Sequence, residues 1–146
     1  MEDKNQEVIL EMKDLSISFF NKSGEIQAVR GINYTLHKGE VLGIVGESGS
    51  GKSVSSHGIL RLTPDTGKVK TGEILFHGKD ILKMNKKELQ ELRGNKIAMI
   101  FQDPMMTLNP VLRVDTQMIE AVQGHHKVSR EQARDRALQT LTMVGI

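Results

Sequence analysis

The sequence contains no cysteine among its 146 residues, so it can form neither disulfide bonds nor thiolate metal sites. This absence is compatible with a reducing, cytoplasmic compartment. The chain also has no apolar run that approaches the roughly 20 residues needed to span a bilayer. Its N-terminal segment alternates charged and apolar residues and lacks the basic and then apolar segments of a signal peptide. If the protein works at a membrane, we expect something other than this chain to anchor it there.

A strong excess of charge of one sign is missing as well. The 20 basic and 18 acidic residues give a formal net charge of +2 and are scattered along the chain, which offers no concentrated field to a nucleic acid. The lysine-rich segment Lys79–Lys87 is interpreted as an exposed approach to a helix. Hydrophobic residues make up 38% of the chain and charged residues 26%, which is typical of one globular domain of this length.

The first third of the chain has the pattern of an antiparallel β-hairpin. Apolar and polar residues alternate within Val8–Phe20, and a second run, Ile26–Leu36, follows a short polar turn. Two short and nearly continuous apolar runs, Val41–Val45 and Lys96–Gln102, are instead typical of strands buried on both faces in a parallel sheet. A further strand, with a turn at His77 and Gly78, is predicted within Glu73–Ile81.

Helices are predicted where apolar residues recur at helical spacing, and two of these segments open with a capping box. The boxes pair Asn85 with Glu88 and Ser129 with Gln132. Thr63–Gly72 is interpreted as a polar connection. The order of these elements indicates a mixed α/β domain. The predicted helices are Lys52–Leu62, a short helix after Asn85 that runs to Arg93, Thr116–Gln123, and a helix from Ser129 that Gly145 stops.

A glycine-rich segment directly follows the first of the buried-strand candidates. It matches G-x-x-x-x-G-K-[ST] at every fixed position. Glycines let consecutive backbone N–H groups turn inward around phosphates, and the following helix adds the positive end of its dipole. A flexible linker would not require a buried strand before the segment and a helix after it, so we predict a loop that binds nucleoside triphosphate phosphates. The segment comprises Gly46, Glu47, Ser48, Gly49, Ser50, Gly51, Lys52 and Ser53.

Two residues of this loop have predicted roles. The ammonium group of Lys52 is expected to reach the β- and γ-phosphates as a mobile point charge. The hydroxyl of Ser53 is expected to take a place on Mg²⁺. A bare phosphate loop does not distinguish kinases, GTPases and transport ATPases, because all of them use it.

The residues around the loop resemble the ATP-binding subunits of ABC transporters. In "AVRGINYTLHKGEVLGIVGESGSGKS" a hairpin leads through a K-G-E turn into the phosphate loop, and "AMIFQDP" looks like the Q-loop of that family. "GIVGESGSGKSV" and "AMIFQDPMMTLNP" are similar to the oligopeptide and dipeptide importer branch. The resemblance extends over Leu15–Ile146.

This resemblance implies the fold and further site residues. The implied fold is α/β, a P-loop NTPase of the ABC type. An antiparallel β subdomain and part of a RecA-like core would span about 8–102, and the start of a helical subdomain about 103–146. Phe19 would stack on adenine, with Phe20 as a competing candidate. Val29 and Val54 would lie close to the nucleotide, and Gln102 would contact Mg²⁺ and the attacking water.

The resemblance also implies partners and a location. The chain would bind ATP and Mg²⁺ at the cytoplasmic face of the cell membrane as a peripheral protein. It would pair head to tail with a second ATPase subunit and contact transmembrane permease subunits, the latter near Met105 and Met106. The cargo stays open within this branch: dipeptides, longer peptides, nickel or glutathione.

The rest of the family's hydrolysis machinery does not follow Gln102. The sequence has no LSGGQ signature, no apolar strand ending in Asp-Glu and no switch histidine, and the pair His125 and His126 is interpreted as solvated. We therefore expect an N-terminal portion of a longer ATPase, which binds ATP with negligible turnover. Val41–Val45 and Lys96–Gln102 would then lack their shared neighbours and leave two strand edges bare.

Two other functions are open at this stage. The chain could be a non-catalytic module that holds nucleotide or only pairs with a full-length subunit. It could also be a P-loop kinase of small molecules, for which Arg130, Arg134 and Arg136 would supply the arginines of a lid. The kinase interpretation leaves the hairpin and the "FQDP" segment unexplained.

Overall fold

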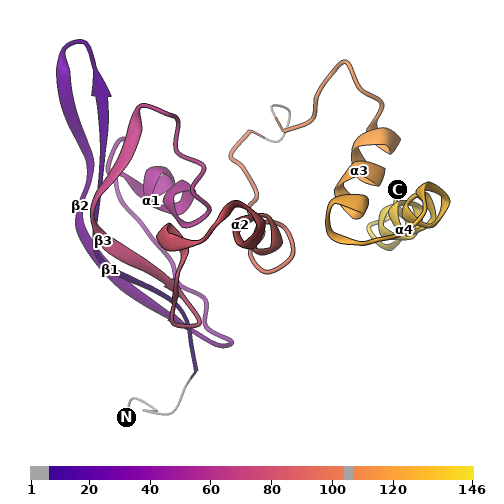
Figure 1. The fold of residues 1–146 in the computed structure, drawn as a ribbon, viewed down its shortest axis with the longest axis horizontal. Coiled ribbons are helices and arrows are strands. Elements are labelled where there is room, and N and C mark those ends of the chain that lie inside the picture. Colours follow the sequence, from indigo (N-terminus) through magenta and orange to yellow (C-terminus); the bar gives the residue numbers. More distant parts are fainter. Residues whose placement is uncertain (1–6, 104–106) are drawn as a thin grey trace. The chain divides into compact units, whose positions relative to one another are not determined.

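The computed structural model describes residues 7–103 and 107–146. The chain divides into two compact units, 1–90 and 91–146, and each unit is described by itself. Figure 1 shows the order of the elements along the chain. The expectation of a partner contact at Met105 and Met106 falls outside the described residues.

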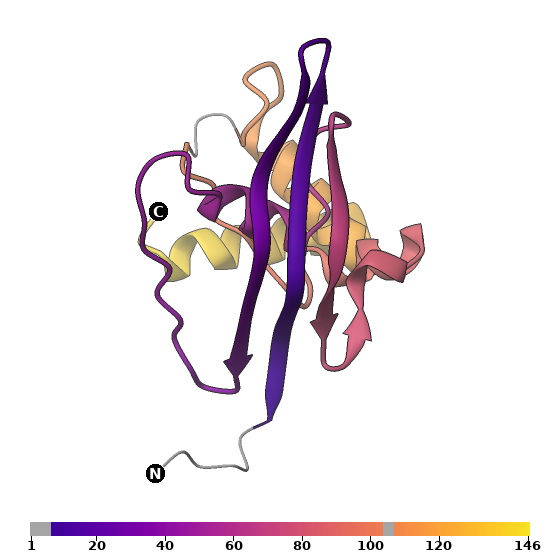
Figure 2. The same cartoon turned by 90° about the vertical axis from the view of Figure 1, so that its left-hand side faces the viewer.

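The first unit is built on a four-stranded antiparallel sheet. β1 (Val8–Asn21) and β2 (Gly24–His37) form the predicted hairpin, which is confirmed, and β3 (Gly67–Phe76) and the short β4 (Lys79–Asp80) follow on the other side of β1. The resulting order is β2-β1-β3-β4, and the three long strands lie side by side in Figure 2. β1 therefore has a neighbour on both sides.

One face of this sheet is covered by α1 (Lys52–Ile59). The side chains of Leu15, Ile17 and Ile74 are fully buried there, because β-strands place alternate residues on one face. Gly58 of α1 faces β1: a Cβ atom at this position would lie 2.9 Å from Cδ1 of Ile17. The absence of a side chain at Gly58 therefore allows α1 to approach the sheet closely.

The polar connection predicted over Thr63–Gly72 is partly wrong, because β3 already begins at Gly67. Val69 pairs with Ile17 and Lys68 with Ser18, so the polar residues of this segment are incorporated into the sheet. Alternating lysines and small residues fit an edge of the sheet where one face meets solvent.

Both predicted buried strands of a parallel sheet are absent from the structure. Residues 41–47 have no regular structure, and Val41 and Val45 are 95% and 94% exposed. In Lys96–Gln102 only Ile97 forms an isolated bridge, to Arg93, and Ile100 is 96% exposed. Within the described residues no strand lies beside either segment, so their backbone groups have no ladder to join and their side chains no layer to cover them.

Three α-helices follow the sheet within the described residues. α2 (Lys86–Leu92) comes after the short 3-10 turn Ile81–Lys83, and its chain continues from the first unit into the second. The capping box predicted for it is confirmed: the N–H of Glu88 donates to Oδ1 of Asn85, and the N–H of Asn85 donates to Oε2 of Glu88.

The second unit contains α3 (Val114–His125) and α4 (Arg130–Met143). They pack through buried apolar residues, namely Ile119, Ala133 and Ala137. The predicted capping box of Ser129 and Gln132 is confirmed, and so is the helix stop at Gly145, which has φ 84°. Among the described residues, no helix has the length and apolar character needed to cross a membrane.

His125 at the end of α3 differs from the solvated histidine that was expected. Its Nδ1 atom is buried and has no hydrogen-bond partner. A Cβ atom on Gly94 would lie 2.9 Å from its Nε2, so the ring packs against backbone within the second unit. His126 is exposed, as expected.

Candidate functional site

The phosphate-loop candidate is anchored to the sheet at Gly51, the second fixed glycine of its sequence pattern. Gly51 has φ 89° and ψ 0°, in the left-handed region that favours glycine. A Cβ atom there would lie 2.4 Å from the carbonyl oxygen of Ala28 and 3.3 Å from Cγ2 of Val29, both on β2. Any other residue would therefore have to push the loop away from the strand. This contact fixes where α1 begins.

The ammonium group of Lys52 lies inside the curve of the loop. It donates to the carbonyl oxygens of Gly46 and Glu47, each at 2.7 Å, and to Oγ of Ser50 at 3.1 Å. A Cβ atom on Gly46 would lie 2.8 Å from Oγ of Ser50, so a larger residue here would require the Ser50 side chain to move. The loop thus concentrates a positive charge among exposed residues, where an anion can reach it.

The N-terminus of α1 adds further donors at the same place. Its cap residue Gly51 has no side chain that could accept from the first-turn N–H groups, and the first turn contains no acidic residue. No side chain of the helix therefore accepts from those N–H groups or neutralises the positive end of the helix dipole, and both face the loop. The hydroxyl of Ser53, in the first turn, is exposed. The arrangement suits a phosphate group.

A magnesium ion at this site would depend on the nucleotide for its ligands. Among the described residues there is no cluster of three or more His, Cys, Asp or Glu side chains that could hold a metal ion. The exposed hydroxyl of Ser53 can supply one oxygen, which fits Mg²⁺ because this ion keeps several waters and takes phosphate oxygens as ligands.

Phe19 and Phe20 lie on opposite faces of β1. Phe19 follows Ile17 by two residues in an unbroken pairing with β3, so both side chains are on the face that α1 covers. The ring of Phe19 lies against Gly67, where a Cβ atom would come within 2.8 Å of it. The Phe20 ring has the ammonium groups of Lys68 and Lys70 above it, at 5.8 and 5.3 Å from its centroid. Phe19 therefore lies on the face of β1 that α1 covers, and Phe20 lies on the other face.

An apolar hollow of about 480 Å³ adjoins the loop in the first unit. Val29, which is 4% exposed, and Tyr34 belong to its lining together with Gly46 and Lys52. Burial raises the pKa of the Tyr34 phenol above its ordinary value. Val54, one residue beyond the loop, is half-buried in α1.

Gln102 belongs to the second unit, whereas the phosphate loop belongs to the first. It is exposed and lies in a stretch without regular structure. Its predicted role toward Mg²⁺ and water stays a prediction. The three arginines considered for a kinase lid, Arg130, Arg134 and Arg136, are also exposed and lie on α4 of the second unit.

Sequence reasoning missed how the loop is held in place. The close approach of Gly51 to β2 and of Gly58 to β1 depends on contacts between distant segments. The only local signal was an isolated glycine within a helical pattern at position 58, which indicates close packing or a functional constraint.

Comparison with known proteins places these features in a family. The family model described as "ABC transporter" matches residues 29–146. The oligopeptide transport ATP-binding protein OppD of Bacillus subtilis is 54% identical over 139 residues, which cover 94% of this chain and 39% of that protein. The dipeptide transport ATP-binding protein DppD of the same organism is 48% identical over 141 residues, 96% of this chain and 42% of that protein. The chain thus spans about two fifths of the length of these relatives.

Solved structures show the same fold. The dimeric structure of MJ0796, described as a bacterial ABC transporter cassette, superimposes with a TM-score of 0.78 at 26% identity, covering 94% of this chain and 58% of that one. A post-hydrolysis state of the same cassette bound to ADP and Pi gives a TM-score of 0.75 at 24% identity, with the same coverage. The predicted α/β class of an ABC-type ATPase is therefore confirmed.

Proposed function

The chain belongs to the ABC transporter family, and we propose that it supplies the phosphate-binding half of an ATP site in a peptide importer. The observation that carries the proposal is the position of Lys52, whose ammonium group is enclosed by three oxygens of the loop at the N-terminus of α1. The names of the relatives, which are oligopeptide and dipeptide transport proteins, support peptides as the cargo of the complete transporter.

Each residue of the site has a separate part in this proposal. Backbone N–H groups of Gly46–Ser53 hold the phosphates, and Lys52 neutralises charge on the β- and γ-phosphates. Ser53 holds Mg²⁺, which would offset the charge of the phosphates. Phe19 stacks on the adenine ring, and its place on the face of α1 supports it over Phe20.

Hydrolysis requires more than these residues. Gln102 orients the attacking water and contacts Mg²⁺ in our proposal, but the 146 residues contain no apolar strand ending in Asp-Glu and no LSGGQ signature. Phosphoryl transfer depends on the full set of charge-stabilising groups. We therefore propose that these residues alone bind ATP with negligible turnover.

The proposed partners follow from the same family membership. A second ATPase subunit would face the loop head to tail, and transmembrane permease subunits would hold the protein at the cytoplasmic face of the membrane. The dimeric cassette among the structural neighbours supports the first of these partners.

Equilibrium binding of a fluorescent ATP analogue with Mg²⁺ tests the proposed function. We expect saturable binding that unlabelled ATP displaces, and at least a tenfold loss of affinity in Lys52→Ala because a charge-assisted contact to phosphate is removed. Lys127→Ala, which removes an exposed lysine of the second unit, should bind like the wild type. Equal affinity of the wild type and Lys52→Ala would refute the proposal.

The base contact is tested in the same assay. Phe19→Ala should weaken the binding of ATP several-fold and leave the binding of inorganic triphosphate unchanged, because only the base is lost as a contact. Phe20→Ala serves as the matched control on the opposite face. If Phe20→Ala weakens ATP binding and Phe19→Ala does not, the assignment of Phe19 is wrong.

A further inference from the structure

The helix that begins at the phosphate loop ends in an unusual way. After α1 the N–H of Arg61 donates to the carbonyl oxygen of Gly58 at 3.0 Å, and the N–H of Leu62 donates to that of His57 at 2.9 Å. This pair of hydrogen bonds is a Schellman ending, in which the residue at the position of Arg61 adopts a left-handed conformation and is most often glycine. Arg61 has φ 51°. An arginine here carries a backbone strain that glycine would avoid.

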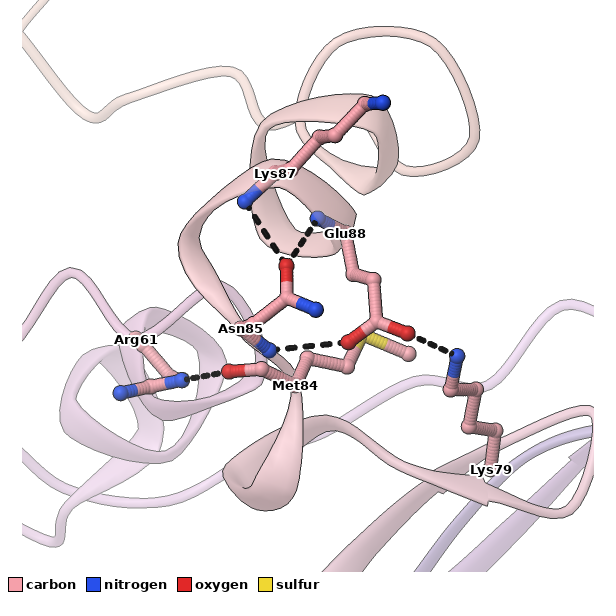
Figure 3. Close-up of polar contacts among 6 residues, drawn as sticks. All are labelled: Arg61, Lys79, Met84, Asn85, Lys87 and Glu88. Atoms are coloured by element: carbon pink, nitrogen blue, oxygen red, sulfur yellow. Dashed lines mark hydrogen bonds and ion pairs between the residues drawn. The ribbon is translucent and has the colours of Figure 1, made fainter.

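The side chain of Arg61 makes a contact that glycine could not make. Its Nη1 donates to the carbonyl oxygen of Met84 at 2.8 Å, across 23 positions of the sequence (Figure 3). Arg61 itself is exposed, but the accepting residue Met84 is only 9% exposed, so the hydrogen bond is part-buried. A hydrogen bond from a charged donor is stronger than one between two neutral groups.

Met84 is the residue immediately before the capping box of α2. Oδ1 of the next residue, Asn85, accepts from the N–H groups of Lys87 and Glu88, each at 3.0 Å. The carboxylate of Glu88 accepts from the N–H of Asn85 at 2.9 Å and from Nζ of Lys79 on β4 at 2.6 Å. Figure 3 shows these contacts meeting at the first turn of α2. Fixing the carbonyl of Met84 therefore fixes the direction in which α2 starts.

We propose that Arg61 is a positioning residue that ties the end of α1 to the start of α2. α1 begins at Lys52 and Ser53 of the phosphate loop, so a change in α1 on phosphate binding is carried through Arg61 to Met84 and α2. The outlying backbone conformation of Arg61 is retained because its guanidinium group makes this tie. The functional consequence, communication from the loop to α2, rests on the proposed binding of ATP. The tie itself does not.

Substitution of Arg61 by glycine distinguishes the contact of its guanidinium group with Met84 from the role of its backbone in ending α1. Arg61→Gly relieves the left-handed strain and keeps the Schellman ending but removes the guanidinium group. Arg61→Ala removes the same group and keeps the strain. Lys79→Ala is the control, since it breaks an exposed ion pair to the same helix turn, with both side chains more than a third exposed.

Amide hydrogen exchange measured residue by residue in the nucleotide-free protein tests the tie. The reporter is the N–H of Leu89, which donates to the carbonyl of Asn85 at 3.0 Å in the first turn of α2. We expect its protection to fall about tenfold in Arg61→Gly and in Arg61→Ala, and less than threefold in Lys79→Ala. The N–H of Ser55 in α1 should keep its protection in Arg61→Gly. Unchanged protection of Leu89 in Arg61→Gly would overturn the proposal.

Addition of ATP with Mg²⁺ then tests the communication. In the wild type we expect protection to rise in the loop, at Ser55 and at Leu89, and in Arg61→Gly only in the loop and at Ser55. A rise at Leu89 that persists in Arg61→Gly would refute communication through Arg61. If ATP changes no amide of the loop in the wild type, the proposed ATP site is wrong, while the nucleotide-free comparison still decides whether Arg61 ties the two helices.

Discussion

The antiparallel sheet and the two apolar segments Val41–Val45 and Lys96–Gln102 contain similar strand-forming residues. Only those of the sheet form paired strands. In the sheet, Ile17 of β1 is fully buried and its strand is paired on both sides. In the segments, Val41, Val45 and Ile100 are all more than nine-tenths exposed and no ladder forms. A run of apolar residues therefore has the composition of a strand but becomes one only beside a neighbour that completes its hydrogen bonds.

The largest expected effect on stability comes from comparing one residue type, isoleucine, in the sheet and in an unpaired segment. Ile17→Ala should lower the free energy of unfolding of the first unit by about 3 kcal/mol, because it leaves a cavity in a close-packed core. Ile100→Ala removes the same atoms from a side chain that is 96% exposed and should change stability by no more than about 0.5 kcal/mol. Urea unfolding of both variants measures the difference. Similar losses would show that Ile100 is buried in solution.

A second contrast concerns the loop, which keeps its shape although the segment before it is unpaired. Gly51→Ala should cost about 2 kcal/mol and abolish ATP binding, because its Cβ would meet the carbonyl of Ala28. Gly49→Ala has a similar φ of 80° but nothing within 4 Å of the added carbon, so it should cost only about 1 kcal/mol. Thermal unfolding and ATP titration of the pair would decide this. Equal effects would mean that the contact with β2 does not hold the loop.

A smaller effect is expected from pH at the start of α2. Hydrogen bonds from the ammonium group of Lys79 and from the N–H of Asn85 lower the pKa of Glu88 below its ordinary value of 4.5. A lowered pKa contributes stability that is present above pH 4.5 and is lost as the pH falls through the folded value. The melting temperature of the wild type should therefore exceed that of Glu88→Gln at neutral pH, and the difference should shrink below pH 4.5. A constant difference would contradict this assignment.

The smallest effect on stability is expected from charges in the unpaired segment. Val41→Lys with Val45→Lys should leave the free energy of unfolding within about 0.5 kcal/mol of the wild type, since both side chains are exposed. The same change should reduce self-association, because charged residues protect unpaired strand-forming segments. Light scattering over a range of concentrations measures it. A strictly monomeric wild type would show that these segments do not associate.

The features that could be predicted from the sequence are those whose causes are local. The alternation within Val8–Phe20 predicted β1, and the capping boxes at Asn85 and Ser129 predicted where two helices begin. The phosphate-loop pattern is also local, because it specifies the glycines that the turn requires.

The features that escaped prediction depend on partners far away in the chain. Val41–Val45 forms no strand because no neighbouring strand lies beside it within the described residues. The contact of Gly51 with Ala28, and that of Arg61 with Met84, join segments separated by about 20 residues or more. No periodicity along the sequence encodes such contacts, because they exist only once the sheet has positioned α1.

The central claim is that Gly46–Ser53 binds the phosphates of ATP through Lys52. A ligand that binds only the folded protein raises its stability, by about 2.7 kcal/mol at a concentration 100 times its Kd. Thermal unfolding of the wild type and Lys52→Ala across a range of Mg²⁺–ATP concentrations tests this claim most directly. The account predicts a melting temperature that rises with ATP in the wild type, and a rise of the same size in Lys52→Ala only at ATP concentrations at least tenfold higher. A rise of the same size in both proteins at equal ATP concentrations, or none in the wild type, would contradict it.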